Sequence, residues 1–296
     1  MIQGEPSNQV IQSAENPYNS TVSLSQEQIR RFETDGYLSL PEITTQDEVA
    51  WMREVYDRLF ERKPGWNKGD FFDFAGTDEE GAPARLPQLL NPSCYEPTLA
   101  QTIFRANADA IARQLLGDKA KLIFEHAMMK PALNGGETAW HQDAAFYAKY
   151  TNYRAITIWM PLQPVDDLNG CMEFIPGSQR GALTAHRHVN DDPRIHGLEA
   201  VGVDGSLAIQ CPLRAGGATI HGDKTLHHAG PNRSDKPRRA YALVYGLRGR
   251  QFILHEDHPW NQAGSTARER RLATSRGPAQ QVTAKLKDIA KRILRS

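Results

Sequence analysis

His141 and Asp143 are the residues whose types and spacing are best suited to metal chemistry. They stand two positions apart in GGETAWHQDAAFY, residues 135–147, a stretch with the character of a β-strand. Side chains alternate across a strand, so the imidazole and the carboxylate project from the same face and can bind one cation together. Two ligands do not complete a coordination set, and a third has to come from elsewhere in the chain.

The third ligand is expected from a second histidine-rich stretch, HGDKTLHHAGPNRSDKPRRA, residues 221–240. Non-haem Fe(II) oxygenases place two histidines and one carboxylate on one face of the metal and bind a co-substrate and O2 on the open face. His228 faces away from His227 if the backbone there is extended. The Gly-Asp turn after His221 leaves the direction of that side chain open. The residues alone therefore leave three candidates for this ligand.

An ordered set of motifs resembles the phytanoyl-CoA dioxygenase-like (PhyH) family of Fe(II)/2-oxoglutarate-dependent oxygenases. The likeness covers roughly residues 24–247 and rests on His-Gln-Asp at 141–143, Trp159, NGCMEFIPGSQRG at 169–181, HHAGPN at 227–232 and Arg238. The pattern His-x-Asp alone arises by chance in many proteins. The full set in this order is far more specific.

The resemblance implies that His141, Asp143 and His227 are the catalytic residues and the ligands of Fe(II). His227 is favoured because residues 227–232 fit the family's His-x-x-Gly-x-Asn pattern, and His221 then becomes a supporting or pocket residue. Related halogenases carry a small residue in place of the carboxylate. Asp143 therefore favours hydroxylation, desaturation or another oxidation.

The resemblance also implies 2-oxoglutarate as co-substrate beside O2, with Arg238, His126 and Trp159 around it. Arg238 is at the family's place for the arginine that grips the far carboxylate, and a guanidinium can meet a carboxylate with two parallel hydrogen bonds. Arg239 is the rival, but neighbours on a strand face opposite ways, so only one can point inward. The chain departs from the family at Ala229, where a serine hydroxyl often contacts the co-substrate, a loss of about 1 kcal/mol.

Phe146, Tyr147 and Arg154 follow the metal stretch and are our candidates for substrate contacts. The expected activity is oxidation of a small organic molecule in natural-product or lipid-like metabolism, with release of succinate and CO2. The alternatives are a non-catalytic ligand-binding barrel of the same fold and a zinc hydrolase, which can also use two histidines and a carboxylate. A hydrolase has no use for an arginine placed like Arg238.

The surrounding elements predict a mainly β protein with flanking helices, and the family implies a double-stranded β-helix (jelly-roll, cupin-like) barrel. Capping residues and apolar spacing predict helices near residues 25–36, 45–63 and 97–116. Short strands follow from residue 121 to residue 247, and helices before a run of antiparallel strands favour this architecture. The Gly-, Pro- and Asp-rich segment 65–97 is too long for an ordinary connection, which favours a lid, a binding loop or a mobile segment. Its aromatic residues either close over a substrate or only anchor the loop to the rest of the domain.

The chain is predicted to form one oxygenase domain over residues 24–262. A flexible arm is expected at 1–23, and a basic helical extension at 263–296 is expected to pack on the same domain or on a second copy, as in a homodimer. Lys plus Arg and Asp plus Glu number 35 each, which favours a small-molecule substrate over nucleic acid or a membrane surface. Three widely spaced cysteines, with no signal-like N-terminus or long apolar run, predict a cytoplasmic protein.

Overall fold

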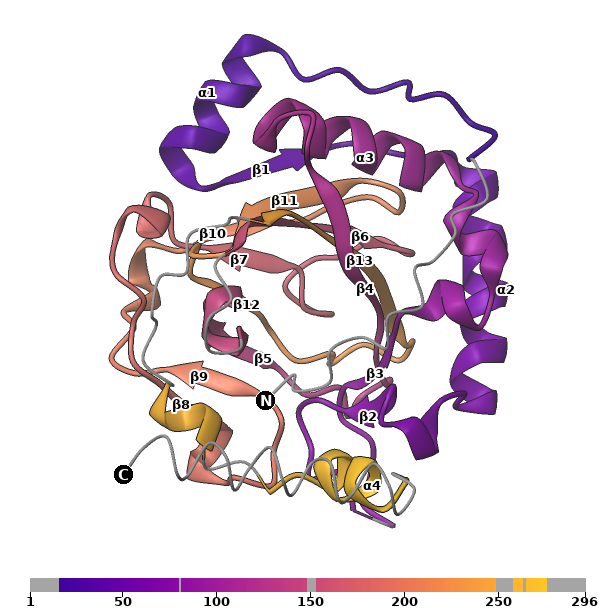
Figure 1. Cartoon of the computed structure of the whole chain (residues 1–296), viewed down its shortest axis with the longest axis vertical. Helices are drawn as coiled ribbons and strands as arrows, with labels where there is room; N and C mark the ends of the chain where they lie inside the picture. The colour runs from indigo at the N-terminus through magenta and orange to yellow at the C-terminus, as the bar shows by residue number, and fades with distance from the viewer. Residues whose placement is uncertain (1–15, 80, 148–152, 249–257, 263–264, 276–296) are drawn as a thin grey trace.

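The computed structural model of the chain describes residues 16–79, 81–147, 153–248, 258–262 and 265–275 (Figure 1). The described strands form a seven-stranded antiparallel sheet, a four-stranded antiparallel sheet and a two-stranded ribbon. The large sheet contains, in order, β1 (Tyr37–Leu40), β11 (Ala218–Gly222), β6 (Tyr153–Pro161), β13 (Arg238–Arg248), β4 (Lys121–Lys130), β3 (Pro87–Leu90) and β2 (Phe71–Asp73). The small sheet contains β10 (Ile209–Cys211), β7 (Met172–Phe174), β12 (His227–Ala229) and β5 (Thr138–His141), and the ribbon contains β8 (His186–His188) and β9 (Leu198–Ala200).

In the described part of the chain, three α-helices come before β4 and the strands that follow it, as the sequence predicts, and cover one face of the large sheet (Figure 1). In α1 (Gln26–Asp35), Ser25 forms a capping box with Gln28, and Gly36 ends the helix at φ 81°, a conformation that glycine adopts without strain. Thr45 caps α2 (Gln46–Arg62), and Thr102 caps α3 (Ile103–Leu116). These local signals are sufficient to fix where the helices begin.

Period-two alternation along β6 divides the interior into two cores. Ile156, Ile158 and Met160 pack with α2 and α3, whereas Trp159 packs in a second apolar cluster with Phe174 of the small sheet. The second cluster lies between the two sheets, and in it the inner face of the large sheet meets β7, β10 and β12. Opposed antiparallel sheets with flanking helices are the double-stranded β-helix architecture predicted from the sequence. The described sheets stay open at their edges and do not close into one hydrogen-bonded barrel.

A buried polar network joins α3 to the large sheet. The carboxylate of Glu125 on β4 accepts hydrogen bonds from the Arg105 side chain, the Tyr241 hydroxyl at 2.7 Å and the Ser93 amide at 2.9 Å. The Glu125 side chain has no exposed surface. Because three donors satisfy it, the charge is tolerated inside the protein.

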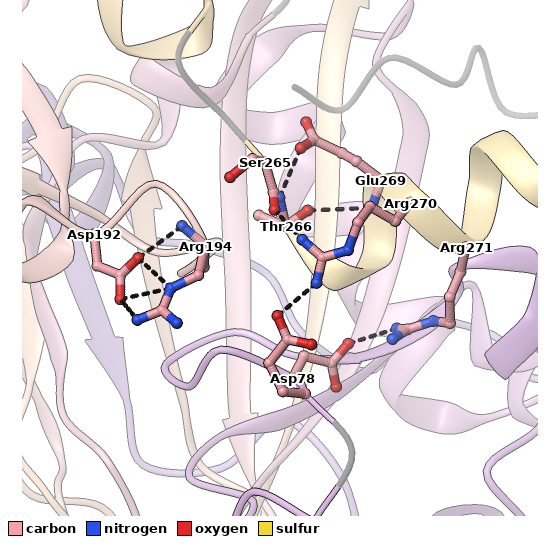
Figure 2. Close-up of polar contacts among 9 residues, drawn as sticks. Asp78, Asp192, Arg194, Ser265, Thr266, Glu269, Arg270 and Arg271 are labelled. Carbon is pink, nitrogen blue, oxygen red and sulfur yellow. Dashed lines mark hydrogen bonds and ion pairs between the residues drawn. The ribbon is translucent and has the colours of Figure 1, made fainter.

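The segment 65–97 is structured, which its composition did not reveal. It contributes β2 and β3 to the edge of the large sheet, where β3 pairs with β4. A C-terminal helix, α4 (Ala267–Ser275), lies against this segment (Figure 1). Figure 2 shows Arg271 reaching Asp78, and Thr266 and Glu269 exchanging backbone-to-side-chain hydrogen bonds at the start of α4.

The two ends of the chain are described only in part. Residues 16–23 of the predicted arm lie along α3, where Asn16 donates to the Thr102 carbonyl and Thr21 donates its amide to Asn107. Most of the predicted basic helical extension, residues 276–296, lies outside the described residues. Among the described helices, none is long and apolar enough to cross a membrane.

Candidate metal centre

The first two predicted ligands lie at the end of β5. His141 is the last residue of the strand, and Asp143 begins a 3₁₀ turn, Asp143–Phe146. Gln142 between them keeps extended dihedral angles (φ −120°, ψ 130°), so the alternation that places 141 and 143 on one side persists beyond the strand. The Gln142 side chain donates to the Lys224 carbonyl at 2.7 Å and accepts from the Thr184 amide at 2.8 Å. These bonds fix the turn that carries Asp143.

β12 brings His227 to the same place. In the β12–β5 ladder His227 lies directly opposite His141, and their ring centroids are 4.0 Å apart. The Ser178 hydroxyl of the Pro-Gly-Ser motif accepts from the Leu226 amide at 2.9 Å and so anchors the start of β12. Gly170 is required for close approach, because a Cβ there would lie 2.2 Å from the Gly230 carbonyl oxygen. The segment between the two metal stretches therefore positions the third ligand.

One nitrogen of each of these two histidines is occupied by the backbone. Nδ1 of His141 lies 2.8 Å from the Ala139 carbonyl oxygen, and Nδ1 of His227 lies 2.8 Å from the Thr225 carbonyl oxygen. A carbonyl accepts but cannot donate, so both Nδ1 atoms carry the proton and both Nε2 atoms keep a free lone pair. Such backbone support is typical of metal-binding histidines.

The Nε2 atoms of both histidines lie close to the same oxygen of the Asp143 carboxylate. Oδ1 of Asp143 lies 3.6 Å from Nε2 of His141 and 3.5 Å from Nε2 of His227. The ligand atoms of the three residues all lie within 4.8 Å of one another. Burial lowers the pKa of His227, which keeps that imidazole neutral.

This donor set fits a ferrous ion. Two neutral imidazoles and one carboxylate oxygen are the two-histidine, one-carboxylate ligands of non-haem iron oxygenases, and all three approach from one side. The Oδ2 atom of Asp143 is engaged elsewhere, because it accepts a hydrogen bond from the Thr157 hydroxyl at 2.6 Å. Nε2 of His221 lies 3.4 Å from the same Oδ2 atom. The three predicted ligands thus come together, and His221 lies on the carboxylate side of them.

Arg238 is buried on the inner face of the large sheet, with 2% of its surface exposed. Its guanidinium lies over the Trp159 ring at 5.4 Å, and neither its Nε nor its Nη1 has a hydrogen-bond partner among the described residues. Burial lowers the pKa of Arg238 to about 9. An unpaired buried cation is costly, so this position fits an anionic ligand.

His126 and Trp159, two of the predicted co-substrate residues, lie on either side of one small residue of the large sheet. Ala242 on β13 lies opposite His126 on one side and opposite Trp159 on the other. Nδ1 of His126 lies 3.4 Å from Oε1 of Gln88, and burial lowers the pKa of His126 to about 4. His126 is therefore a neutral ring on the same face as Arg238.

Arg239 and His228, the alternatives to Arg238 and His227, point away from the candidate site. Arg239 faces the opposite side of β13 and pairs with Asp57, as alternation along the strand requires. His228 stacks on Trp140 at 5.2 Å and lies 3.6 Å from Glu173, on the outer side of the small sheet.

Lys130 shares one face of β4 with His126 but was not among the predicted site residues. It lies opposite Arg238 in the β4–β13 ladder and is fully buried. Its ammonium donates to the carbonyl oxygens of Ala229, at 2.8 Å, and of Gly230. Burial and the charge of Arg238 hold the pKa of Lys130 well below its usual range. The lysine ties the end of β12, just beyond His227, to the large sheet.

Of the three predicted substrate residues, two lie near the candidate ligands and one does not. Phe146 lies edge-on to His141 at 5.8 Å and packs beside Phe74 and His196, at 5.7 Å and 6.4 Å. Tyr147 follows it, and its carbonyl accepts from Asn261. Arg154 is exposed near the far end of β6, and no described contact joins it to the ligand residues. No sequence motif pointed to His196, because it enters this wall only through tertiary packing.

Comparisons with known proteins agree with this geometry. The family model for phytanoyl-CoA dioxygenase (PhyH) matches residues 32–240. A probable alpha-ketoglutarate-dependent hypophosphite dioxygenase of Stutzerimonas stutzeri is 27% identical, covering 74% of this chain and 77% of its own length. The ectoine dioxygenase of Bordetella bronchiseptica is 25% identical, with 75% of each chain covered.

A solved structure is also similar over most of the chain. EvdO2 from Micromonospora carbonacea var. aurantiaca is 33% identical, has a TM-score of 0.70, and covers 82% of this chain and 99% of its own. The same enzyme has been solved in complex with 2-oxoglutarate. Since the family model spans most of the described sheets and all three ligand positions, this chain belongs to the phytanoyl-CoA dioxygenase (PhyH) family.

Proposed function

We propose that this protein is an Fe(II)- and 2-oxoglutarate-dependent dioxygenase that oxidises a small organic molecule. The observation that carries the proposal is the convergence of His141, Asp143 and His227, with ligand atoms within 4.8 Å of one another, beside a buried arginine. A non-catalytic barrel would not need this intact set. A zinc hydrolase would not need an unpaired guanidinium on the adjoining sheet face.

The ligand residues act from one side of the proposed iron site. The two imidazoles and Oδ1 of Asp143 would hold the metal and leave its other side for small ligands. When bound, Fe(II) and 2-oxoglutarate would allow O2 to act as the oxidant, which takes two electrons from 2-oxoglutarate as it becomes succinate and CO2 and two from the substrate as a C–H bond is oxidised. No acid or base side chain is needed for that chemistry.

The inner face of the large sheet orients the co-substrate in this proposal. Arg238 pairs with the far carboxylate, and Trp159 beneath the guanidinium restricts its orientation. His126 lines the same face as a neutral ring. Phe146, with Phe74 and His196, forms an aromatic wall beside His141 that excludes water from the reacting groups.

The substrate is proposed to belong to natural-product or lipid-like metabolism, with hydroxylation or desaturation as the outcome. The named relatives act on compounds as different as hypophosphite and ectoine, so the fold does not select the substrate. Phe146, Tyr147 and Arg154 remain the proposed contacts. Balanced charge supports a small molecule over nucleic acid, and three free cysteines support a cytoplasmic location. Association as a homodimer through the basic C-terminal extension is also a proposal.

Succinate release by the full chain tests the proposal. Purified protein supplied with Fe(II), 2-oxoglutarate and O2 should form succinate slowly, and a screen of small metabolites should find one that accelerates it. Asp143→Ala should abolish this turnover, whereas Asp167→Ala, at a surface position 69% exposed, should retain it. Wild-type turnover by Asp143→Ala would remove Asp143 from the site.

A further inference from the structure

A third histidine adjoins the ligand residues. His221 on β11 has 1% of its surface exposed, and its ring centroid lies 4.2 Å from that of His227 and 5.3 Å from that of Phe174. Neither ring nitrogen has a hydrogen-bond partner among the described residues. A buried polar ring without partners is costly, so the position calls for an explanation.

The backbone distinguishes His221 from the two ligand histidines. His141 and His227 each place Nδ1 against a carbonyl, which commits the proton to Nδ1 and leaves Nε2 bare for a metal. His221 has no such tie at Nδ1. Its proton is therefore free to reside on Nε2, the nitrogen that faces the Oδ2 atom of Asp143 at 3.4 Å.

Strand pairing sets a threonine hydroxyl and an imidazole beside the same oxygen. His221 lies directly opposite Thr157 in the β11–β6 ladder, so both side chains lie on the inner face. The Thr157 hydroxyl donates to Oδ2 of Asp143 at 2.6 Å, while Oδ1 faces His141 and His227. The two oxygens of this carboxylate thus have separate surroundings: Oδ1 faces His141 and His227, and Oδ2 faces the Thr157 hydroxyl and the His221 ring.

We propose that His221 is a positioning residue that, together with Thr157, holds Oδ2 of Asp143 away from the iron. The carboxylate then binds through Oδ1 alone, and the coordination position that a second oxygen would occupy stays available. This inference rests on the iron site proposed above. It deepens that proposal by assigning a task to a residue that is not a ligand.

Metal binding by the full chain tests this role. Fe(II) should be titrated anaerobically into apo-protein with 2-oxoglutarate, and Co(II) absorption should be recorded in parallel, because its intensity reports coordination number. His221→Leu and the matched variant Thr157→Val should each weaken Fe(II) binding about ten-fold. Both should also shift the Co(II) spectrum toward a higher coordination number. His221→Gln, which keeps a donor, should restore most of the affinity.

Two outcomes would overturn the inference. His221→Leu could leave both the affinity and the Co(II) spectrum unchanged, or it could abolish metal binding as completely as His227→Leu does, which would make His221 a ligand. Wild-type protein that binds no Fe(II) would instead reject the proposed function.

A second measurement needs no variant. In Zn(II)-loaded wild-type protein labelled with ¹⁵N-histidine, two of the metal-site imidazoles should carry the proton on Nδ1 alone, and His221 should carry one on Nε2. A bare Nε2 on His221 would contradict the proposal even if every His221 variant failed to fold.

Discussion

At the scale of single residues, the account depends on Arg238, two of whose guanidinium nitrogens have no hydrogen-bond partner in the part of the chain that the structure describes. Its guanidinium is buried with Nε and Nη1 unpartnered among the described residues, whereas Arg239 pairs with Asp57 on the opposite side of β13. Arg238→Ala should therefore raise the 2-oxoglutarate concentration needed for half-maximal succinate release about 100-fold, from loss of two charge-assisted hydrogen bonds. Arg239→Ala should change it less than about three-fold. Equal effects would show that the wrong arginine had been chosen.

A buried imidazole predicts acid sensitivity. Burial lowers the pKa of His186 to about 4, and its Nε2 accepts from the Gln142 amide at 3.2 Å. The unfolded state has a pKa near 6.5, so it binds more protons between pH 6.5 and pH 4. The contribution of His186 to stability is therefore complete above pH 6.5 and lost as the pH falls toward 4, by up to about 3 kcal/mol.

Urea unfolding of apo-protein at a series of pH values measures this contribution. His186→Gln keeps an acceptor for the Gln142 amide but cannot titrate, so the fall in unfolding free energy between pH 6.5 and 4 should be smaller than in the wild type. Buried His196, whose pKa is also lowered by burial, keeps part of the slope in both proteins. Identical slopes would mean that His186 does not stay neutral in the folded state.

The candidate metal ligands, and His221 as a supporting or pocket residue, could be predicted from the sequence, but the contacts made with Asp143 could not. His141 and Asp143 are close in the chain, and their common direction follows from strand alternation. Thr157 and His221 reach Oδ2 only because β6 and β11 pair in one register. That register is set by contacts between distant segments and leaves no local pattern.

At the scale of elements, the link between α3 and the large sheet depends on one buried charge pair. Arg105→Met removes a partner of the fully buried Glu125 and should lower the unfolding free energy by about 3–5 kcal/mol. The matched variant Arg30→Met breaks an exposed pair with Glu27 and should cost less than about 1 kcal/mol. Urea denaturation measures both, and similar small losses would show that Glu125 finds other partners.

Helices were easier to predict than the edge strands. Ser25, Thr45 and Gly36 mark helix ends by their own hydrogen-bonding and backbone preferences. β2 and β3 have three and four residues amid Gly, Pro and Asp, and β3 becomes a strand by pairing with β4. The sequence therefore predicted a loop where the structure extends the sheet.

At the scale of the whole molecule, α4 connects the C-terminal region to the wall beside the iron site. Arg268 donates to the Gly69 carbonyl at 2.6 Å and lies over the Phe72 ring at 4.8 Å. Phe72 in turn packs against His196 at 4.7 Å, and His196 stacks beside Phe146. The C-terminal helix thus supports the aromatic wall through the 65–97 segment.

Loosening α4 should be detectable far from the substitution. Arg268→Ala should increase amide hydrogen exchange in residues 66–78 several-fold, because the Gly69 carbonyl loses its donor and Phe72 loses a neighbour. Arg194→Ala, which breaks the pair with Asp192 shown in Figure 2, should leave that exchange unchanged. Indistinguishable exchange in the two variants would show that the segment is held without α4.

The central claim is that His141, Asp143 and His227 bind one ferrous ion together with 2-oxoglutarate. Anaerobic titration of the apo-protein with Fe(II) in the presence of 2-oxoglutarate tests it most directly. A weak visible charge-transfer band should grow to saturation at one Fe(II) per chain, and it should be absent from His227→Ala. No band in the wild-type protein, or an undiminished band in His227→Ala, would contradict the account.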